Sequence, residues 1–219
     1  MLVKTHVTFE SSWAALKEAV KVGAIRQILR SGDEIPVTLK TGEETVFVAS
    51  YDAAGNLFFV IQNCLPDEHP MNKARTNKGG WADCDMRRHV NETVFALLPD
   101  ELQAVIAPTK VVQIIDGKRV ETEDKLFLLS RTQVYGKGDW SRYEPEDAHL
   151  DIFAKERDRV KEYRDMGTWP YWLRSPLASS STNFCNVNSN GNANSNNASN
   201  ANGVAFGSSP GSAPPWLTK

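Results

Sequence analysis

Charge is missing from one long stretch of this sequence, because no charged side chain occurs from Ser175 to Thr218. Over the whole chain of 219 residues, 25 Lys and Arg face 27 Asp and Glu, and the net charge is −2. A balance of this kind provides no general electrostatic attraction to nucleic acid or to an anionic membrane. We therefore expect no nucleic-acid partner, and any partner must be recognised locally.

Cysteine is scarce as well. Cys64, Cys84 and Cys185 are far apart and odd in number, so they form no disulfide framework, and no pair has C-x-x-C metal spacing. His69 and His89 each follow a cysteine with C-x4-H spacing, but the first pair falls in an expected loop. In the second pair, five residues on a helix are a poor match for one face. We expect no metal and no cofactor.

Long apolar runs are absent too. No segment approaches the roughly 18 consecutive apolar residues of a membrane-spanning helix. The first nine residues lack the basic region and apolar core of a signal peptide. We therefore expect no membrane span and synthesis in the cytosol. Action outside the cell would need another route, such as association with a virion.

Asparagine fills the uncharged stretch instead, at ten of the twenty positions 183–202. Such a composition is common in disordered segments. Here, however, aromatic residues at 169–173 and apolar residues at 204–217 flank the tract, so we expect an ordered coil surface held at both ends. Asn tolerates left-handed backbone and offers both donors and an acceptor. The amides either present a binding surface or merely form turns. The candidate ligand-binding residues are Asn186, Asn188, Asn190, Asn192, Asn194, Asn196, Asn197 and Asn200.

Arg174 is the one charge at the head of this neutral tract. We interpret it as a buried guanidinium that bonds main-chain carbonyls and stacks on Trp172 or Trp169, which would organise the coil that follows. The same two tryptophans are expected to be core anchors and not a binding platform. Trp81 completes the set of expected structural anchors.

Hydrophobic periodicity divides the rest of the chain into helices and strands. Trp13, Leu16 and Val20 recur at helical spacing between a capping Ser12 and Gly23, which predicts a helix. Runs rich in β-branched and aromatic residues predict a three-stranded antiparallel meander at 35–39, 45–50 and 57–62. Beyond it we expect a loop at 66–80, helices at 81–91 and 99–106, strands at 111–115 and 125–129, and a solvated helix at 146–163.

Several blocks of sequence resemble one bacterial and phage family. They are W-x5-R-x3-N from Trp81 to Asn91, Leu98-Pro99, D-K-L-F-L-L-S at 124–130, and Y-W-L-R-S-P at 171–176 before the Asn-rich run. Together they resemble the domain of unknown function 6273 family. The sequence departs from the family's usual closing G-V-R-P strand, because residues 203–206 read G-V-A-F.

The resemblance implies an α+β fold: a single C-type-lectin-like domain with an antiparallel sheet, few helices and a long C-terminal coil region. The domain would span 32–219, with residues 1–31 as a helical segment packed on it. Formylglycine-generating enzymes and the variable proteins of diversity-generating retroelements share that fold. In the variable proteins the C-terminal surface is rewritten at adenines in Asn-type codons, so an Asn-rich tract resembles an unrewritten version.

The function expected from this resemblance is non-enzymatic ligand binding. The chain would be a phage, prophage or bacterial adhesin that presents the Asn-rich surface to a protein or glycan on a bacterial cell, alone or as a homo-oligomer. One alternative is a structural or assembly protein of a virion or tail. Another is an enzyme related to the formylglycine-generating group.

The sequence gives little support for calcium binding or for nucleophilic catalysis. Asn186, Asn188, Asn190 and Gly191 follow the spacing of a calcium loop, but no carboxylate lies near and amides alone bind Ca²⁺ poorly. Nucleophilic catalysis needs an activated Ser or Cys beside a base. Ser175 lies in no G-x-S-x-G elbow, and the cysteine at 185 is alone where formylglycine-generating relatives use a pair. We therefore name no catalytic residue.

Overall fold

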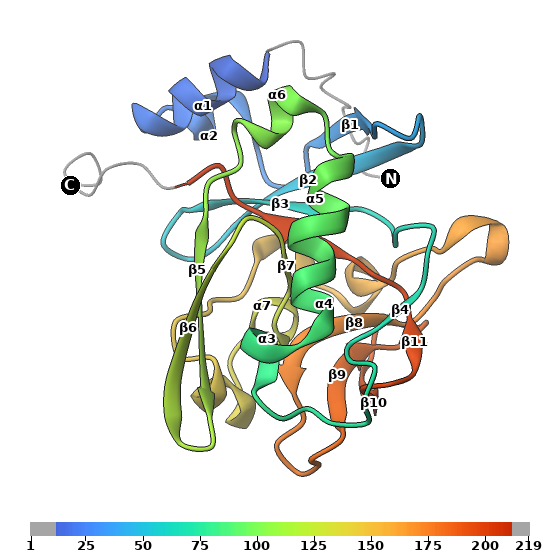
Figure 1. Ribbon diagram of the computed structural model, residues 1–219. Helices are drawn as coiled ribbons and strands as arrows, with labels where there is room; N and C mark the ends of the chain where they lie inside the picture. The colour runs from blue at the N-terminus through green and yellow to red at the C-terminus, as the bar shows by residue number, and fades with distance from the viewer. Residues whose placement is uncertain (1–11, 212–219) are drawn as a thin grey trace.

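The computed structural model describes residues 12–211 (Figure 1). Within that range the chain combines helices with antiparallel sheets, which confirms the α+β class. The largest sheet has the strand order β1-β2-β3-β12-β7. Its strands are β1 (Glu34–Thr38), β2 (Glu44–Tyr51), β3 (Leu57–Ile61), β12 (Phe206–Ser208) and β7 (Phe127–Leu128).

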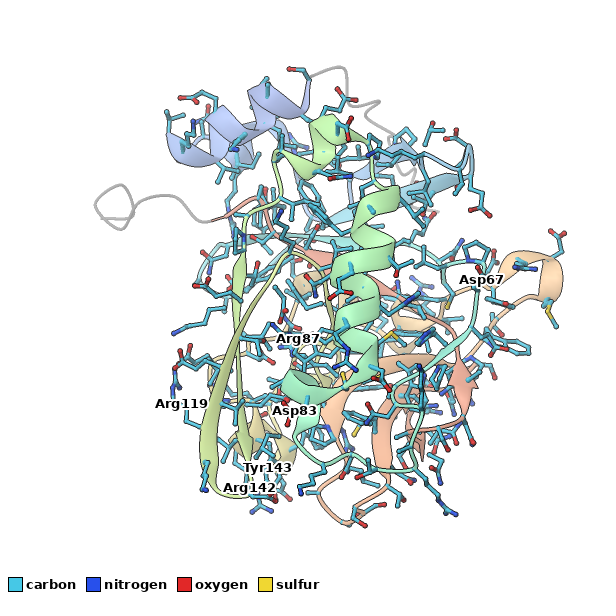
Figure 2. The ribbon with its side chains drawn as sticks, viewed as in Figure 1. Asp67, Asp83, Arg87, Arg119, Arg142 and Tyr143 are labelled. Carbon is cyan, nitrogen blue, oxygen red and sulfur yellow. The ribbon has the colours of Figure 1, made fainter. Side chains whose placement is uncertain are left out.

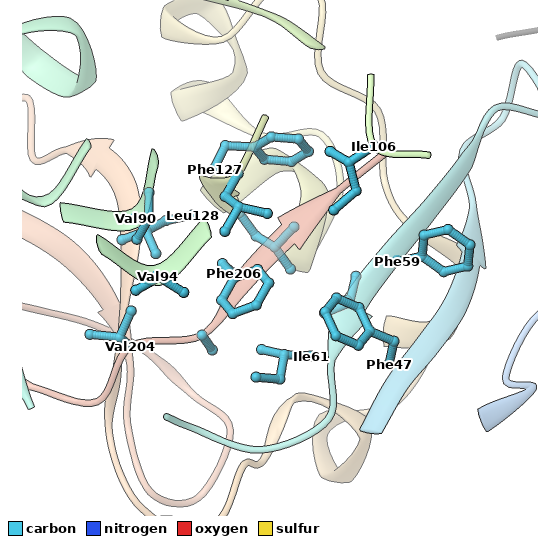
Figure 3. Packing of buried hydrophobic residues seen from close by; sticks show 14 of the residues in the cluster. Phe47, Phe59, Ile61, Val90, Val94, Ile106, Phe127, Leu128, Val204 and Phe206 are labelled. Atoms are coloured by element: carbon cyan, nitrogen blue, oxygen red, sulfur yellow. The ribbon is translucent and has the colours of Figure 1, made fainter. Parts of the chain in front are cut away.

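The predicted meander is therefore confirmed as β1, β2 and β3. Strand β12 lies between β3 and β7, so the chain that leaves the Asn-rich tract returns to an interior position of the main sheet. Phe206 packs there against Phe47 (Figure 3), and their ring centroids are 5.6 Å apart. Gly207 pairs with Val60 on one side and Phe127 on the other, which defines the register of the last strand. The tract is thus held at its C-terminal end by the core.

Helix α1 (Trp13–Lys21) begins after Ser12, whose hydroxyl accepts a 3.2 Å hydrogen bond from the main-chain nitrogen of Ala15. Its buried side chains join the same hydrophobic core as the main sheet, and Trp13 meets Phe59 edge to face at 5.9 Å. The short helix α2 (Ile25–Ile28) follows. The predicted N-terminal helix is confirmed.

A long helical run covers the front of the molecule in Figure 1. It consists of α3 (Gly80–Asp83), α4 (Asp85–Arg88), a π-helical turn η1 (His89–Val94) and α5 (Phe95–Leu97), and a separate α6 (Asp100–Gln103) follows. The predicted helix at 81–91 ended too early. Val90, Val94 and Leu98 are buried one turn apart, and this apolar side carries the run onward.

The hairpin after α6 differs from the prediction. The predicted strands at 111–115 and 125–129 are present as β5 (Thr109–Ile115) and β7, but β5 pairs with β6 (Lys118–Asp124), a strand that was not predicted. Strand β6 was missed because K-R-V-E-T-E-D carries charge at most positions, which a two-stranded ribbon exposed on one side tolerates.

The predicted helix at 146–163 was wrong. That stretch forms only short 3-10 turns, η3 (Asp151–Phe153) and η4 (Glu156–Arg159). Two aspartates help to explain the difference: Asp158 makes a local bond to the main chain that competes with a helix, and Asp151 ties the chain to β2. Asp158 accepts from the main-chain nitrogen of Lys155 at 2.8 Å, and Asp151 accepts from that of Tyr51 at 2.9 Å. Helix α7 (Arg131–Tyr135) and the turns η2 (Asp139–Tyr143) and η5 (Arg164–Met166) lie on either side.

The tract 183–202 is not the coil that we expected. A second sheet, in the order β10-β9-β8, contains β8 (Tyr171–Pro176), β9 (Asn183–Val187) and β10 (Ala193–Asn197). A small third sheet pairs β11 (Ala201–Asn202) with β4 (His69–Pro70). The reason is burial, because Phe184, Cys185 and Val187 are at most 3% exposed and fix β9 against the core. Gly191, with φ of 87°, allows the turn that joins β9 to β10.

Candidate functional site

Arg174 anchors the start of the C-terminal sheet from inside the protein. Its side chain is 1% exposed in β8, and Nη1 donates hydrogen bonds of 2.7 Å to the main-chain oxygen of Leu128 and to Oε1 of Gln133. Nη2 forms an ion pair with Asp147. The guanidinium lies 5.6 Å from the ring centroid of Phe127. The expected stacking on Trp172 or Trp169 was wrong, while the bond to a main-chain carbonyl is present.

A second buried carboxyl adjoins this network. Glu144 is 1% exposed; its Oε1 accepts from the hydroxyl of Ser175, and its Oε2 accepts from Thr132 Oγ1 at 3.1 Å. Burial, followed by the nearby charge of Asp147, raises the pKa of Glu144. Ser175 also accepts a 2.8 Å hydrogen bond from the main-chain nitrogen of Arg131. Both oxygens of this carboxyl are thus used within the fold.

The three tryptophans expected as anchors occupy different surroundings. Trp172 is completely buried, and its Nε1 donates a 2.8 Å hydrogen bond to the main-chain oxygen of His69 in β4. Trp81 is buried in α3. Trp169 is half-buried; its Nε1 bonds Oε1 of Glu68 at 2.8 Å and its ring stacks on Tyr163 at 5.4 Å.

The register of the C-terminal sheet determines which side of the sheet each asparagine faces. Strands β9 and β10 pair Asn186 with Asn194, and β8 pairs Trp172 with Asn186. Because side chains alternate along a strand, Asn194 and Asn196 point to one side of β10, and Asn192 is exposed directly before its first residue. Asn200 joins them through a 2.8 Å bond from its Nδ2 to Oδ1 of Asn196. We call Asn192, Asn194, Asn196 and Asn200 the Asn face.

The amides of the Asn face are largely available to solvent. Asn192, Asn194 and Asn200 are exposed, and Asn196 is half-buried. Within the described part of the chain, the side chains of Asn192 and Asn194 make no hydrogen bond. Asn196 is different, because its Oδ1 also accepts a 2.8 Å bond from the main-chain nitrogen of Asn197. The face therefore offers two free amides beside two that bond each other.

The other predicted binding asparagines support the fold. Asn186 is 3% exposed. Asn188 shapes the hairpin turn, because its Oδ1 accepts from the main-chain nitrogens of Asn190 at 3.2 Å and Asn192 at 2.8 Å. Asn190 is exposed at that turn, and Asn197 is half-buried with a 3.4 Å contact to the hydroxyl of Ser199. The structure thus places turn-forming and solvent-facing amides in the same tract.

Two amide atoms beneath the Asn face lack a partner. Oδ1 of Asn186 and Nδ2 of Asn202 are buried and make no hydrogen bond to any residue that the structure describes. Trp172 pairs with Asn186 and donates its main-chain nitrogen at 3.1 Å to the oxygen of Gly203, the residue that follows Asn202. Buried polar atoms normally have partners. Each is therefore a place where a water molecule or a polar group of a ligand would find a partner.

A loop at 176–181 precedes the Asn face and separates two hollows. Nδ2 of Asn77 holds it with hydrogen bonds to the main-chain oxygens of Ser180 at 2.7 Å and Asn183 at 2.8 Å. Sequence reasoning missed Asn77 because it stands in a polar loop far from its partners. One hollow, of about 690 Å³, lies between this loop, residues 76–79 and the turn of the β5–β6 hairpin.

The other hollow, of about 430 Å³, lies on the far side of the loop. Arg131, Trp140, Arg142 and Tyr143 contribute to its wall, together with Cys185. Figure 2 shows Arg142 and Tyr143 beside the turn of the β5–β6 hairpin. We call this space the arginine hollow.

Catalytic chemistry is poorly supported in the arginine hollow. Burial raises the pKa of Cys185 to about 11, so the thiol is protonated at neutral pH and a weak nucleophile. Glu144 is engaged by Ser175 and Thr132 and is not free to act as a base. Across residues 12–211, no three His, Cys, Asp or Glu side chains are grouped to hold a metal ion. No helix in that range is both long and apolar enough to cross a membrane.

Fold and site together define an α+β protein whose polar C-terminal sheet is fastened to the core by a buried arginine. Residues 43–207 match the family described as Domain of unknown function (DUF6273), and the chain belongs to that family. No curated protein and no solved structure matches the chain.

Proposed function

We propose that this protein is a non-enzymatic binding module that presents the Asn face to a protein or glycan on a bacterial cell surface. One observation carries the proposal: Asn192 and Asn194 are exposed on a hairpin and keep their side-chain donors and acceptors free of the described residues. Each free amide offers two donors and an acceptor to a neutral polar ligand. Adaptable polar side chains on a rigid scaffold are typical of recognition surfaces.

The surroundings of the Asn face support this proposal. No charged residue lies in the tract, so the face suits uncharged hydroxyl and amide groups. The unpartnered atoms of Asn186 and Asn202 add an acceptor and a donor beneath it. A hydroxyl both donates and accepts, so a hydroxyl-bearing ligand suits either atom.

A phage or prophage origin, a C-type-lectin-like fold and diversification by a retroelement belong to the same proposal. They are supported by the W-L-R-S-P block and by the Asn-rich tract that follows it. The coding DNA tests the last point. A reverse-transcriptase gene nearby, with a second copy of the Asn-coding repeat, would support diversification, and its absence beside several family members would count against it.

A binding experiment tests the Asn face directly. The full chain is screened against arrays of bacterial surface glycans and against surface-protein extracts, beside a variant with Asn192→Ala and Asn194→Ala. Gln27→Ala is the matched control, because Gln27 is an exposed amide on α2. We expect the double variant to lose at least one ligand that the control retains. Identical ligand profiles for all three proteins would refute the role of the face.

The enzyme alternative is favoured by one observation, the gathering of Glu144, Ser175 and Cys185 at the arginine hollow. The binding function ranks first because Glu144 is buried and bonded to Ser175 and Thr132, and because burial keeps the Cys185 thiol protonated. Labelling with iodoacetamide discriminates between them. A reactive, low-pKa thiol at Cys185 would favour an enzyme, whereas slow labelling that rises only at strongly alkaline pH fits the binding module.

A further inference from the structure

The arginine hollow contains guanidinium groups without acidic partners. Arg131 begins α7, and its guanidinium lies 4.0 Å from the ring centroid of Trp140. Arg142 is exposed and donates a 2.9 Å hydrogen bond to the hydroxyl of Tyr143. Neither arginine forms an ion pair with any residue from 12 to 211. Nε of Arg131 is buried and has no hydrogen-bond partner there.

The acidic groups of the wall do not neutralise both guanidiniums. Glu144 directs its two oxygens to Ser175 and Thr132. Asp139 is an exposed wall residue and forms no ion pair with the described residues. The remaining lining is neutral and includes loop residues 176–179. An anion of modest charge is therefore the ligand that this wall favours.

We propose that the arginine hollow binds a carboxylate-bearing sugar, of which a hexuronic acid is the simplest example. Arg131 and Arg142 supply the fork of N–H donors that matches a carboxylate. The half-buried rings of Trp140 and Tyr143 supply flat apolar surfaces for the face of a sugar ring. A volume of about 430 Å³ lies in the range of small-molecule sites.

A sugar acid fits this wall better than an acidic peptide does. The loop opposite the arginines offers the hydroxyl of Ser179 and uncharged small side chains, which suit a ring rich in hydroxyl groups. A peptide with several carboxylates would meet Asp139 at the same site.

This site is independent of the Asn face. Cys185 lines the arginine hollow, while the next residue along β9, Asn186, pairs with Asn194 of the Asn face. Neighbouring residues of a strand point to opposite sides of the sheet. The two sites therefore lie on opposite sides of the C-terminal sheet, and one can exist without the other.

Titration of the full chain with D-glucuronate and with D-glucose, followed by NMR chemical shifts, tests the proposal. We expect D-glucuronate to bind at least about tenfold more tightly than D-glucose, because only the acid forms charge-assisted hydrogen bonds. Added salt should weaken the binding of the acid. The shifts should include the indole N–H of Trp140, which bonds the main-chain oxygen of Gly136 at 3.1 Å.

Variants assign the effect to named residues. Arg131→Gln and, separately, Arg142→Gln should each weaken D-glucuronate binding about tenfold. Arg142 is exposed, so its variant keeps the test valid if Arg131→Gln fails to fold. Arg30→Gln, an exposed arginine outside the hollow, is the control and should bind as the parent does.

The outcomes are distinct. Equal binding of the two sugars, or unchanged binding after Arg142→Gln, would overturn the proposal. So would a preference for a glutamate-rich peptide with no binding of D-glucuronate. The variant with Asn192→Ala and Asn194→Ala should still bind D-glucuronate, which separates this site from the proposed role of the Asn face.

Discussion

The indole Nε1 of Trp81 donates a 2.8 Å hydrogen bond to Oδ2 of Asp124. Arg87 Nε donates to the other carboxylate oxygen at 2.7 Å. Asn91 completes the set, because its Oδ1 accepts from the main-chain nitrogen of Lys125 at 2.9 Å. The residues of the W-x5-R-x3-N pattern thus join the front helical run to the end of β6. Their role in this structure is to hold the fold, and not to contact the Asn face.

Replacing Asp124 tests this role. Asp124→Asn should lower the free energy of unfolding by about 1 to 3 kcal/mol, because Arg87 loses its charged acceptor in a buried setting. Urea unfolding measures the change. Glu123→Gln alters the exposed neighbour on the same strand and should leave the midpoint nearly unchanged. Equal midpoints for the two variants would contradict a structural role for Asp124.

Arg174 should be more costly to remove than an exposed arginine. Arg174→Ala leaves Asp147 without its ion-pair partner and the main-chain oxygen of Leu128 without a donor, so we expect a loss of about 3 to 5 kcal/mol. Arg164→Gln, which removes an exposed pair with Asp67, should cost about 0 to 1 kcal/mol. Thermal melting compares the variants. A melting temperature preserved in Arg174→Ala would rule out the anchoring role.

The tract should separate into tolerant and intolerant asparagines. Asn192→Tyr and Asn194→Tyr should change the free energy of unfolding by no more than about 0.5 kcal/mol, as at other exposed sites. Asn188→Ala should cost about 1 kcal/mol or more, because two main-chain nitrogens lose their acceptor. Chemical denaturation of the three variants checks this order. A large loss at Asn194 would mean that the face itself is scaffold.

Glu144 should make stability fall as pH rises from acidic to neutral values. Burial raises its pKa in the folded state above the ordinary 4.5, so the folded protein binds more protons than the unfolded chain does. This contribution to stability is complete below pH 4.5 and is lost as pH rises through the raised pKa. Glu144→Gln should flatten that part of the profile, measured as urea midpoints between pH 4 and 8. An unaltered profile would contradict the assignment.

A histidine pair gives the opposite trend. The rings of His69 and His89 stack with centroids 4.1 Å apart, and burial, followed by repulsion from His69, lowers the pKa of His89 below 6.5. Asp67 acts in the other direction. The folded state therefore binds fewer protons than the unfolded chain, and stability falls as pH drops below 6.5. His89→Gln should reduce that loss in melting curves recorded between pH 5 and 7.5, whereas a loss as steep as the parent's would exclude His89 as its source.

Local pattern was enough to predict part of this fold. The spacing of Trp13, Leu16 and Val20 predicted α1, and alternating β-rich runs predicted the meander, because in both cases burial follows the period of the element. The blocks around Trp81 and Arg174 predicted buried anchors. Arg174 is a charge within largely apolar sequence and Trp81 is an aromatic residue within polar sequence, and each contrast is a local signal.

The rest depended on contacts between distant residues. Asp147 pairs with Arg174, yet it lies in a charged stretch that looked solvated. Asn77 bonds Asn183 across 106 positions of sequence, and nothing near Asn77 signals this. The strand β9 escaped prediction because its three buried apolar side chains, among them Phe184, are diluted by asparagine. The arginine hollow was not predicted either, because Arg131 and Trp140 are brought together only by the path of the loop between them.

The side-chain bond from Asn196 to the main-chain nitrogen of Asn197 has a consequence for self-assembly. Strand β10 lies at the edge of its sheet, and the main chains of Asn192 and Ala198 bond inward, to Asn188 and Thr182 at the two ends of β9. The main-chain groups of β10 that face outward without a partner among the described residues are then those of Ala193 and Ser195. Those of Asn197 are already bonded, because its nitrogen donates to the side chain of Asn196 and its oxygen accepts from the main-chain nitrogen of Asn200. An edge strand with so few free main-chain groups offers a strand of another molecule little to pair with. A sequence whose composition favours fibrils is thus folded so that it offers almost no template for growing one.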